Sequence, residues 1–227
     1  MLLLTLFRIA EIEDDGSIEI DGIDIRGIHL PTLRESLSII PQDPVLFAGT
    51  LAYNLDATGK FSAEDMWEAL EATSPELAQQ FCDSGGLETS LTEGGNNLSQ
   101  GQRQLICLAR ALLRKSKILV MDEATSSVDS RTDQQVQHTI RQQFVEQGVT
   151  VITVAHRLDT VMGYDSIAVL GDGNLLEYGP PADLARIPNG ELRRLLDADR
   201  NKQAERSQEG CQAGSRVTLI KKTHNFA

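Results

Sequence analysis

Two short motifs in this chain combine residues that can bind a nucleotide. They are LSQGQ at residues 98–102 and LVMDE at residues 119–123. Ser99 stands where a helix is expected to begin, so its hydroxyl and the free N–H groups of the first turn would bind an anion, with Gly101 allowing close approach. An ordinary serine N-cap is the simpler alternative, but the string GGNNLSQGQRQ at residues 94–104 is longer than a cap requires.

The second motif ends an apolar strand with two carboxylates. Residues 118–121 deliver Asp122 and Glu123 to the carboxyl end of that strand, where ligands bind in open α/β sheets. One carboxylate there can hold Mg²⁺ through water, and the next can orient or deprotonate an attacking water. A solvated strand end that is acidic by accident is the alternative.

Three further polar residues follow predicted strands or turns. His156 comes after a strand at 149–155 and could hydrogen-bond a γ-phosphate, although a lone histidine is more often structural. Gln42 follows a strand at 37–40 and could bind Mg²⁺ or a water, or be only a turn residue. Asp129 would ordinarily be a solvated turn acid or part of a helix entry. Their shared placement favours a site.

A glycine-rich phosphate loop, GxxxxGK followed by Ser or Thr, normally precedes such motifs. The one Gly-Lys pair, Gly59-Lys60, is followed by Phe61, and the glycine required five residues before Gly59 is replaced by Asn54. We therefore expect most of an ATPase domain that begins just after its phosphate loop.

The elements that must position these residues alternate between strands and helices. A hairpin is expected around Asp21-Gly22, and a helical insertion interrupts the alternation over about residues 63–97, with Ser62 as an N-cap and Asp65 three residues later. Helices are also expected from Ser99 and Ser130. Further strands are expected at residues 117–122, 165–170 and 174–178. The order predicts an α/β fold with a mainly parallel, helix-covered sheet.

Composition limits the functional classes. The chain has 227 residues, of which 41% are hydrophobic, and its formal charge of −12 argues against a nucleic-acid partner. Residues 199–227 carry six Lys/Arg against three Asp/Glu, which leaves −15 on residues 1–198. We expect this basic tail to be disordered.

Cysteine usage and hydropathy bear on location. Cys82, Cys107 and Cys211 have no ligand-like spacing, which favours a reduced, cytosolic setting. No apolar run approaches the roughly 18 residues of a membrane helix. Any connection to a membrane is therefore expected to come through a partner.

Together the motifs resemble the nucleotide-binding domain of ABC transporters. The strings PQDP at 41–44, LSQGQRQ at 98–104, ILVMDEATSSVD at 118–129 and TVAHRL at 153–158 look like the Q-loop, signature, Walker B with D-loop, and switch histidine. Residues 2 to about 198 match in order and spacing. Two longer strings, at 40–56 and 93–129, resemble the second, C-terminal nucleotide-binding domain of the C subfamily, the multidrug-resistance-associated exporters, and an intact Glu123 fits this.

The resemblance implies a P-loop-NTPase-like ABC ATPase fold, N-terminally truncated, with ATP and Mg²⁺ as cofactors. Asp122 would coordinate Mg²⁺ through water, Glu123 would act as general base, and His156 would contact the γ-phosphate. Gln42 would couple the metal site to the membrane part.

Partners follow from the same resemblance. Ser99, Gly101 and Gln102 would grip ATP held by a second nucleotide-binding domain in a head-to-tail dimer, and Asp129 would lie at its seam. The insertion at 63–97 would receive the coupling helix of the transmembrane domains, at the cytoplasmic face of a membrane.

Three interpretations remain open. The first is a truncated domain of an exporter, whose isolated chain is expected to hydrolyse ATP poorly or not at all because the phosphate loop supplies most phosphate-binding energy in cis. The second is a non-catalytic module that donates its signature motif in trans. The third is a soluble ABC ATPase, against which ATSSVD, the histidine of TVAHRL and the acidic charge weigh.

Overall fold

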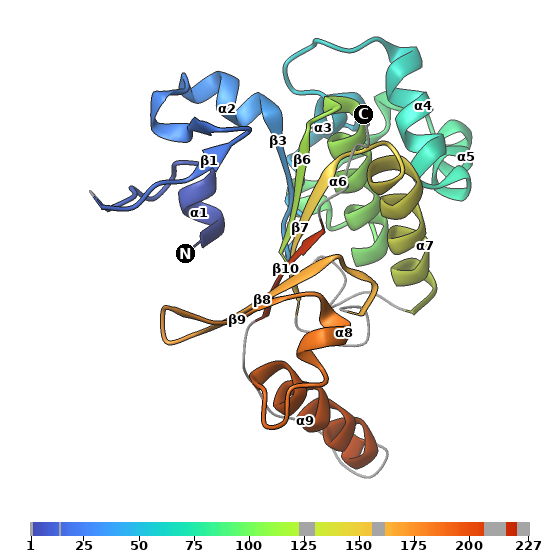
Figure 1. Cartoon of the computed structure of the whole chain (residues 1–227). Helices are drawn as coiled ribbons and strands as arrows, with labels where there is room; N and C mark the ends of the chain where they lie inside the picture. The colour runs from blue at the N-terminus through green and yellow to red at the C-terminus, as the bar shows by residue number, and fades with distance from the viewer. Residues whose placement is uncertain (1, 14, 123–129, 156–161, 207–216, 222–227) are drawn as a thin grey trace.

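The computed structural model describes the chain except for residues 1, 14, 123–129, 156–161, 207–216 and 222–227 (Figure 1). Its centre is a six-stranded sheet with the order β3-β6-β7-β10-β8-β9. The strands of this sheet are β3 (Leu37–Ile40), β6 (Ile118–Asp122), β7 (Thr150–Ala155), β8 (Ser166–Gly171), β9 (Asn174–Gly179) and β10 (Val217–Lys221). Two small sheets pair β1 (Glu19–Ile20) with β2 (Ile23–Asp24), and β4 (Gly49–Thr50) with β5 (Ser90–Leu91).

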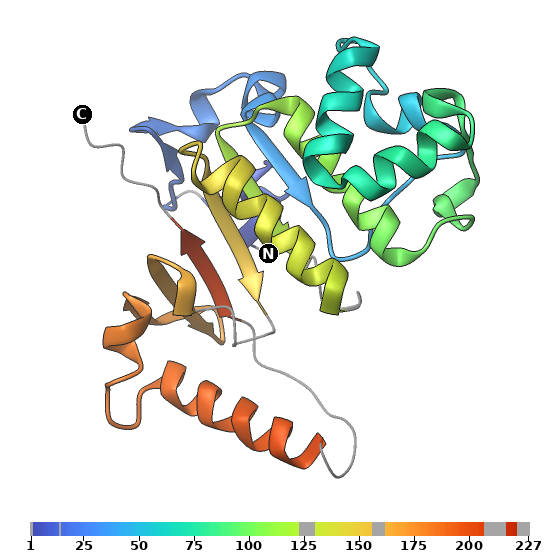
Figure 2. The same cartoon turned by 90° about the vertical axis from the view of Figure 1, so that its right-hand side faces the viewer.

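Helices cover both faces of the parallel part of the sheet (Figures 1 and 2). On one face lie α3 (Leu51–Leu55), α4 (Ala63–Thr73), α5 (Pro75–Asp83), α6 (Gln100–Arg114) and α7 (Ser130–Ile140), the last continuing into the π-helix η4 (Arg141–Val145). On the other face lie α1 (Leu2–Leu6), the β1–β2 hairpin and α2 (Leu30–Ser36). The helices α8 (Pro181–Leu184) and α9 (Glu191–Arg206) follow β9.

The sheet is more mixed than the sequence predicts. β3, β6 and β7 are parallel, as expected, but β10 is antiparallel to β7 and to β8, and β8 is antiparallel to β9. The antiparallel β8–β9 pair follows from its two-residue turn, in which Asp172 and Gly173 have φ of 49° and 79°. Such turns join only neighbouring antiparallel strands. The hairpin predicted around Asp21-Gly22 is confirmed by the β1–β2 pairing.

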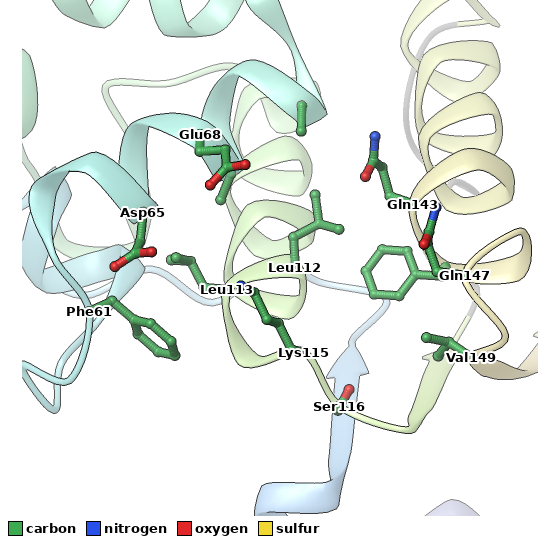
Figure 3. Close-up of a pocket in the computed structure, with 13 residues that line it drawn as sticks. Phe61, Asp65, Glu68, Leu112, Leu113, Lys115, Ser116, Gln143, Gln147 and Val149 are labelled. Atoms are coloured by element: carbon green, nitrogen blue, oxygen red, sulfur yellow. The ribbon is translucent and has the colours of Figure 1, made fainter.

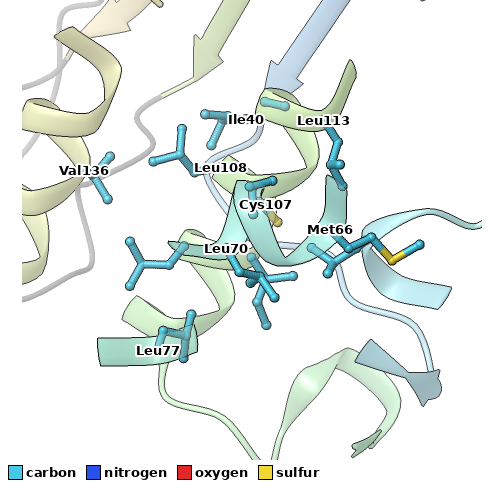
Figure 4. Packing of buried hydrophobic residues seen from close by; sticks show 14 of the residues in the cluster. Ile40, Met66, Leu70, Leu77, Cys107, Leu108, Leu113 and Val136 are labelled. Carbon is cyan, nitrogen blue, oxygen red and sulfur yellow. The ribbon is translucent and has the colours of Figure 1, made fainter. Parts of the chain in front are cut away.

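The main core lies between the sheet and the helices of the first face (Figure 4). Helix α6 is its centre, because Ile106, Leu108 and Ala109 are fully buried and the helix packs against α3, α4 and β3. A fully buried Ile or Leu side chain contributes about 1.5–3 kcal/mol of hydrophobic stabilisation. The core therefore holds α6, and with it the motif at its N-terminus, rigidly against the sheet.

The helical insertion begins as the sequence predicts. Ser62 caps α4 through a capping box, in which its hydroxyl accepts from the Asp65 N–H and the Asp65 carboxylate accepts from the Ser62 N–H. Ser74 then caps α5. Helix α4 thus packs on α6, and α5 packs on α4. In the sequence, both helices lie between β4 and β5.

Residues 199–227 differ from the expectation of a disordered tail in two segments. Helix α9 continues to Arg206, and residues 217–221 form β10 inside the main sheet. The strand contains Val217, Thr218 and Ile220, whose branched side chains favour extended backbone. So short a run shows no periodicity along the chain, and its partners are more than forty residues away in sequence.

Candidate functional site

The parallel strands β3, β6 and β7 end at one edge of the sheet. The register pairs Ile40 with Met121, and Met121 with Thr153. Gln42 follows β3 and is exposed, and Asp122 is the last residue of β6 and is half-buried. An amide and a carboxylate therefore follow adjacent strands at this edge, and both carry oxygen atoms of the kind that Mg²⁺ binds.

Glu123, Asp129 and His156 lie outside the described residues. Their neighbours in the chain, however, are placed: Asp122 ends β6 and Ala155 ends β7. Since these strands are adjacent and parallel, Asp122 and Ala155 lie at the same edge of the sheet.

Ser99 is the N-cap of α6. Its hydroxyl accepts from the Gln102 N–H at 3.1 Å, and the Gln102 side-chain oxygen accepts from the Ser99 N–H at 2.9 Å. Ser99 is therefore an N-cap, as one of the two interpretations of this motif predicts. The N-cap does not exclude the other interpretation, in which this helix end binds an anion. In an α-helix the first N–H groups have no intrahelical acceptor, so those of Gln100 and Gly101 remain directed out of this exposed end.

Gly101 has a packing role that the sequence does not reveal. A Cβ atom at this position would lie 3.0 Å from both the hydroxyl oxygen and the methyl carbon of Thr132 on α7. Glycine at this position therefore allows the close approach of α7, because a Cβ would force the Thr132 side chain to shift by a few tenths of an ångström.

Gln102 connects the start of α6 to the helical insertion. While its side-chain oxygen completes the cap, its amide nitrogen donates to the side-chain oxygen of Gln80 on α5 at 2.8 Å. A displacement of α5 would therefore act directly on the first turn of α6.

Two neighbouring residues that the motif analysis did not select extend this connection. The Gln104 side chain is buried, with 1% exposure, and donates to the Pro41 carbonyl, immediately before Gln42. Arg103 donates to the Gly94 carbonyl at 3.1 Å, and the Gly94 N–H donates to the Leu46 carbonyl. The signal for Gln104 was its spacing of four from Leu108, which places a polar residue on the apolar face of α6.

A polar cluster fixes the segment that follows Gln42. Asn54, with 3% exposure, accepts from the Phe47 N–H at 2.8 Å and donates to the carbonyls of Phe47 and Thr50 at 2.8 and 3.0 Å. Arg110 of α6 donates to the Asn54 side-chain oxygen and backbone carbonyl, and to the Val45 carbonyl. Burial lowers the pKa of the Arg110 guanidinium.

Apolar side chains in and beside the segment that Asn54 and Arg110 hold are exposed to solvent. Val45, Phe47 and Tyr53 are 54%, 54% and 48% exposed, and the two rings meet edge to face with centroids 6.5 Å apart. We call these three residues the 45–53 surface. A cavity of about 370 Å³ lies beside it, with Arg110 and the buried Cys107 in its wall. Burial raises the pKa of the Cys107 thiol.

A larger cavity of about 430 Å³ lies elsewhere, between α4, the end of α6 and η4 (Figure 3). Its lining includes Lys115 and Ser116, which directly precede β6. It is therefore near the amino end of β6, whereas Asp122 is at the carboxyl end. We do not assign this cavity to the nucleotide site.

Comparison with known proteins identifies the class. Residues 1–126, more than half of the chain, match the family described as ABC transporter, and the chain belongs to this family. Among solved structures, a bacterial Atm1-family ABC exporter with ATP bound superposes with a TM-score of 0.78 at 34% identity, over 88% of this chain and 34% of that chain. The predicted ABC ATPase fold is thus confirmed.

The relatives belong to the C subfamily. ATP-binding cassette sub-family C member 2 of Rattus norvegicus is 55% identical over 79% of this chain, and sub-family C member 3 of Mus musculus is 51% identical over 81%. ABC transporter C family member 8 of Dictyostelium discoideum is 45% identical over 89%. The chain spans 11 to 12% of the length of these relatives. The predicted resemblance to this subfamily is confirmed.

Within the part of the chain that the structure describes, no helix is both long enough and apolar enough to span a bilayer.

Proposed function

We propose that this chain is part of the nucleotide-binding domain of an ABC exporter, which binds ATP with Mg²⁺ and takes part in the hydrolysis that drives transport. The main support is the register of β3, β6 and β7, which places Gln42 and Asp122 after adjacent strands at one edge. Helix α6 leads into β6, so its exposed N-terminus with Ser99 points toward the same end of the sheet.

Each residue has a role that its chemistry allows. Asp122 would hold Mg²⁺ through water, with Gln42 as a neutral oxygen ligand beside it. Glu123 would accept a proton from the attacking water, and His156 would donate a hydrogen bond to the γ-phosphate. When bound, Mg²⁺ would stabilise negative charge on the phosphate oxygens.

The start of α6 would serve a second nucleotide-binding domain in a head-to-tail dimer. The Ser99 hydroxyl hydrogen and the N–H groups of Gln100 and Gly101 can donate to a phosphate held by that partner, and the helix dipole favours the negative charge. Gln102 would fix this turn through its bonds to Ser99 and Gln80. Asp129 would lie at the dimer seam.

We further propose that the 45–53 surface, together with the insertion at 63–97, contacts the transmembrane domains at the cytoplasmic face of a membrane. Exposed aromatic side chains held by buried polar bonds are typical of interaction surfaces. The hydrogen bond from Gln104 to Pro41 would couple this surface to α6.

The test for the dimer is ATP-dependent association with a second nucleotide-binding domain that carries a GxxxxGKS loop, measured by light scattering. Ser99→Arg should abolish association, because it places a bulky cation where the phosphate would bind. Ser62→Arg is the matched control, since Ser62 caps α4 with the same capping box. Each substitution removes an N-cap and should cost about 1 kcal/mol of helix stability. Association that survives Ser99→Arg, or is lost equally in the control, would refute the proposal.

A second candidate is favoured by one observation: these 227 residues contain no GxxxxGK sequence. The chain would then act as a non-catalytic module that donates only its α6 terminus. Phosphate release from Mg-ATP by the purified chain separates the two. We expect little release, and turnover that Glu123→Gln abolishes would show instead that the chain is catalytic alone.

A further inference from the structure

A buried hydroxyl without a partner lies in the wall of the cavity beside the 45–53 surface. This cavity of about 370 Å³ is lined by residues of β3, α3 and α6. Ser38 of β3 is 2% exposed, and its Oγ has no hydrogen-bond partner among the described residues. Side chains alternate along a strand, so Ser38 shares a face with Ile40, which packs in the core around α6. The hydroxyl therefore faces α6, and its burial in a polar-lined cavity calls for a ligand or a water as its partner.

Helix α6 places two guanidinium groups in the wall of the same cavity. Arg110 and Arg114 both line it, and their spacing of four puts them on one side of the helix. Burial lowers the pKa of Arg110, and the positive charge of Arg114 lowers it further. The Glu35 carboxylate, which interacts with Arg114 through its charge, is hydrogen-bonded to the Lys60 ammonium at 2.8 Å. No Asp or Glu is among the described residues that line the cavity, so an anion there would relieve the repulsion between the two guanidiniums.

Arg110 is held in position and still has donors to offer. It donates to the carbonyls of Val45 and Asn54 and to the Asn54 side-chain oxygen, which accounts for three of the five N–H groups of a guanidinium. Its Nη1 also lies 3.9 Å from the Cys107 sulfur. Within the described part of the chain, at least one N–H group therefore remains for a ligand oxygen, and the guanidinium is already oriented before a ligand binds.

The rest of the wall is largely apolar. Val45, Leu55 and Ala111 line the cavity together with the rings of Phe47 and Tyr53. A mostly apolar site of this volume, with a few polar groups that converge, is typical of small-molecule binding. A planar carboxylate matches the fork of a guanidinium and can also accept from a serine hydroxyl, whereas a free phosphate would leave the apolar walls without contacts. The lining therefore favours a carboxylate attached to an apolar body.

We propose that the cavity between β3, α3 and α6 binds a small carboxylate with an apolar body, whose oxygens accept hydrogen bonds from the Ser38 hydroxyl and from Arg110 and Arg114. The binding goes beyond the proposed nucleotide function and does not require a nucleotide. Because Arg110 also holds Val45 and Asn54, the bound anion would stabilise the segment that carries the 45–53 surface.

The test is an NMR titration of the full chain with 3-phenylpropionate, compared with the uncharged 3-phenylpropionamide. We expect saturable binding of the anion with a dissociation constant below about 1 mM. The amide should bind at least about tenfold more weakly, because it carries no charge for the guanidiniums. Failure of the anion to bind, or equal binding of both probes, would overturn the proposal.

Ser38→Ala separates a ligand-binding role of the hydroxyl from a structural one. It should weaken binding of 3-phenylpropionate about tenfold and leave the urea midpoint unchanged or raised, because a buried hydroxyl without a partner does not stabilise the fold. Ser116→Ala is the matched control and should leave the affinity unchanged. Ser116 is also buried, with 3% exposure, but it lines the other cavity and its hydroxyl donates to the Ile118 carbonyl.

Arg114→Gln tests the charge without removing the bonds that Arg110 makes to the 45–53 segment. It should also weaken binding about tenfold, whereas Arg186→Gln, which removes the same charge from an exposed position elsewhere, should not. Affinity retained in both Ser38→Ala and Arg114→Gln, or a lowered urea midpoint in Ser38→Ala, would overturn the proposal. Because no ATP or second domain is present, this result is independent of the Ser99→Arg experiment.

Discussion

Asn54 is predicted to be a principal determinant of stability in the segment after Gln42. Its side chain takes part in four hydrogen bonds, with the Phe47 N–H, the carbonyls of Phe47 and Thr50, and the Arg110 guanidinium. Asn54→Ala removes all four and leaves their partners partly buried. A net loss of about 0.5–1.5 kcal/mol for each bond predicts a decrease of roughly 3 kcal/mol in the free energy of unfolding.

The measurement is urea unfolding followed by circular dichroism, with Asn96→Ala as the matched control. Asn96 is exposed, and within the described part of the chain its one side-chain bond is to the Glu93 carbonyl, so its loss should cost less than about 1 kcal/mol. A decrease below about 1 kcal/mol for Asn54→Ala would show that water replaces these bonds without cost, and would refute the reasoning.

The loss should also reach the 45–53 surface. With Asn54 absent, Arg110 retains its bond to the Val45 carbonyl, but Phe47 loses both of its backbone partners in the Asn54 side chain. Limited proteolysis should therefore cut near Phe47 faster in Asn54→Ala than in Asn96→Ala at a urea concentration where both remain folded.

Two further predictions concern helix contacts. Gly101→Ala should destabilise the chain by about 1–3 kcal/mol in urea unfolding, because the added methyl group contacts Thr132 too closely. Adding Thr132→Ala should recover most of that loss. Gly27→Ala is the control, because the space around Gly27 is open, and it should show no comparable effect. Hydrogen bonds from the Ser62 hydroxyl and N–H lower the pKa of Asp65 below its ordinary 3.8, so its stabilising effect is present above that pH and is lost as the pH falls further. Unfolding measured from pH 6 to pH 3 should therefore show the stability advantage of wild type over Asp65→Asn shrinking, and a constant difference would contradict the assignment.

Local signals in the sequence were sufficient for the elements that carry the motifs. The capping boxes at Ser62 and Ser99 each depend on a residue three positions later, and short-range hydrogen bonds of this kind do not need the rest of the fold. The placement of Gln42 and Asp122 was also predictable, because parallel strands joined through helices end at a common edge. The roles of Glu123, Asp129 and His156 stay predictions.

By itself, then, the sequence determined the family, the elements that carry the motifs, and the shared edge at which β3 and β6 end. Only the tertiary structure decided that Gly101 accommodates Thr132, that Asn54 and Arg110 hold the 45–53 surface, and that β10 lies between β7 and β8. The physical reason is distance along the chain. Contacts between segments dozens of residues apart depend on how whole elements pack, and no periodicity or motif within either segment records them.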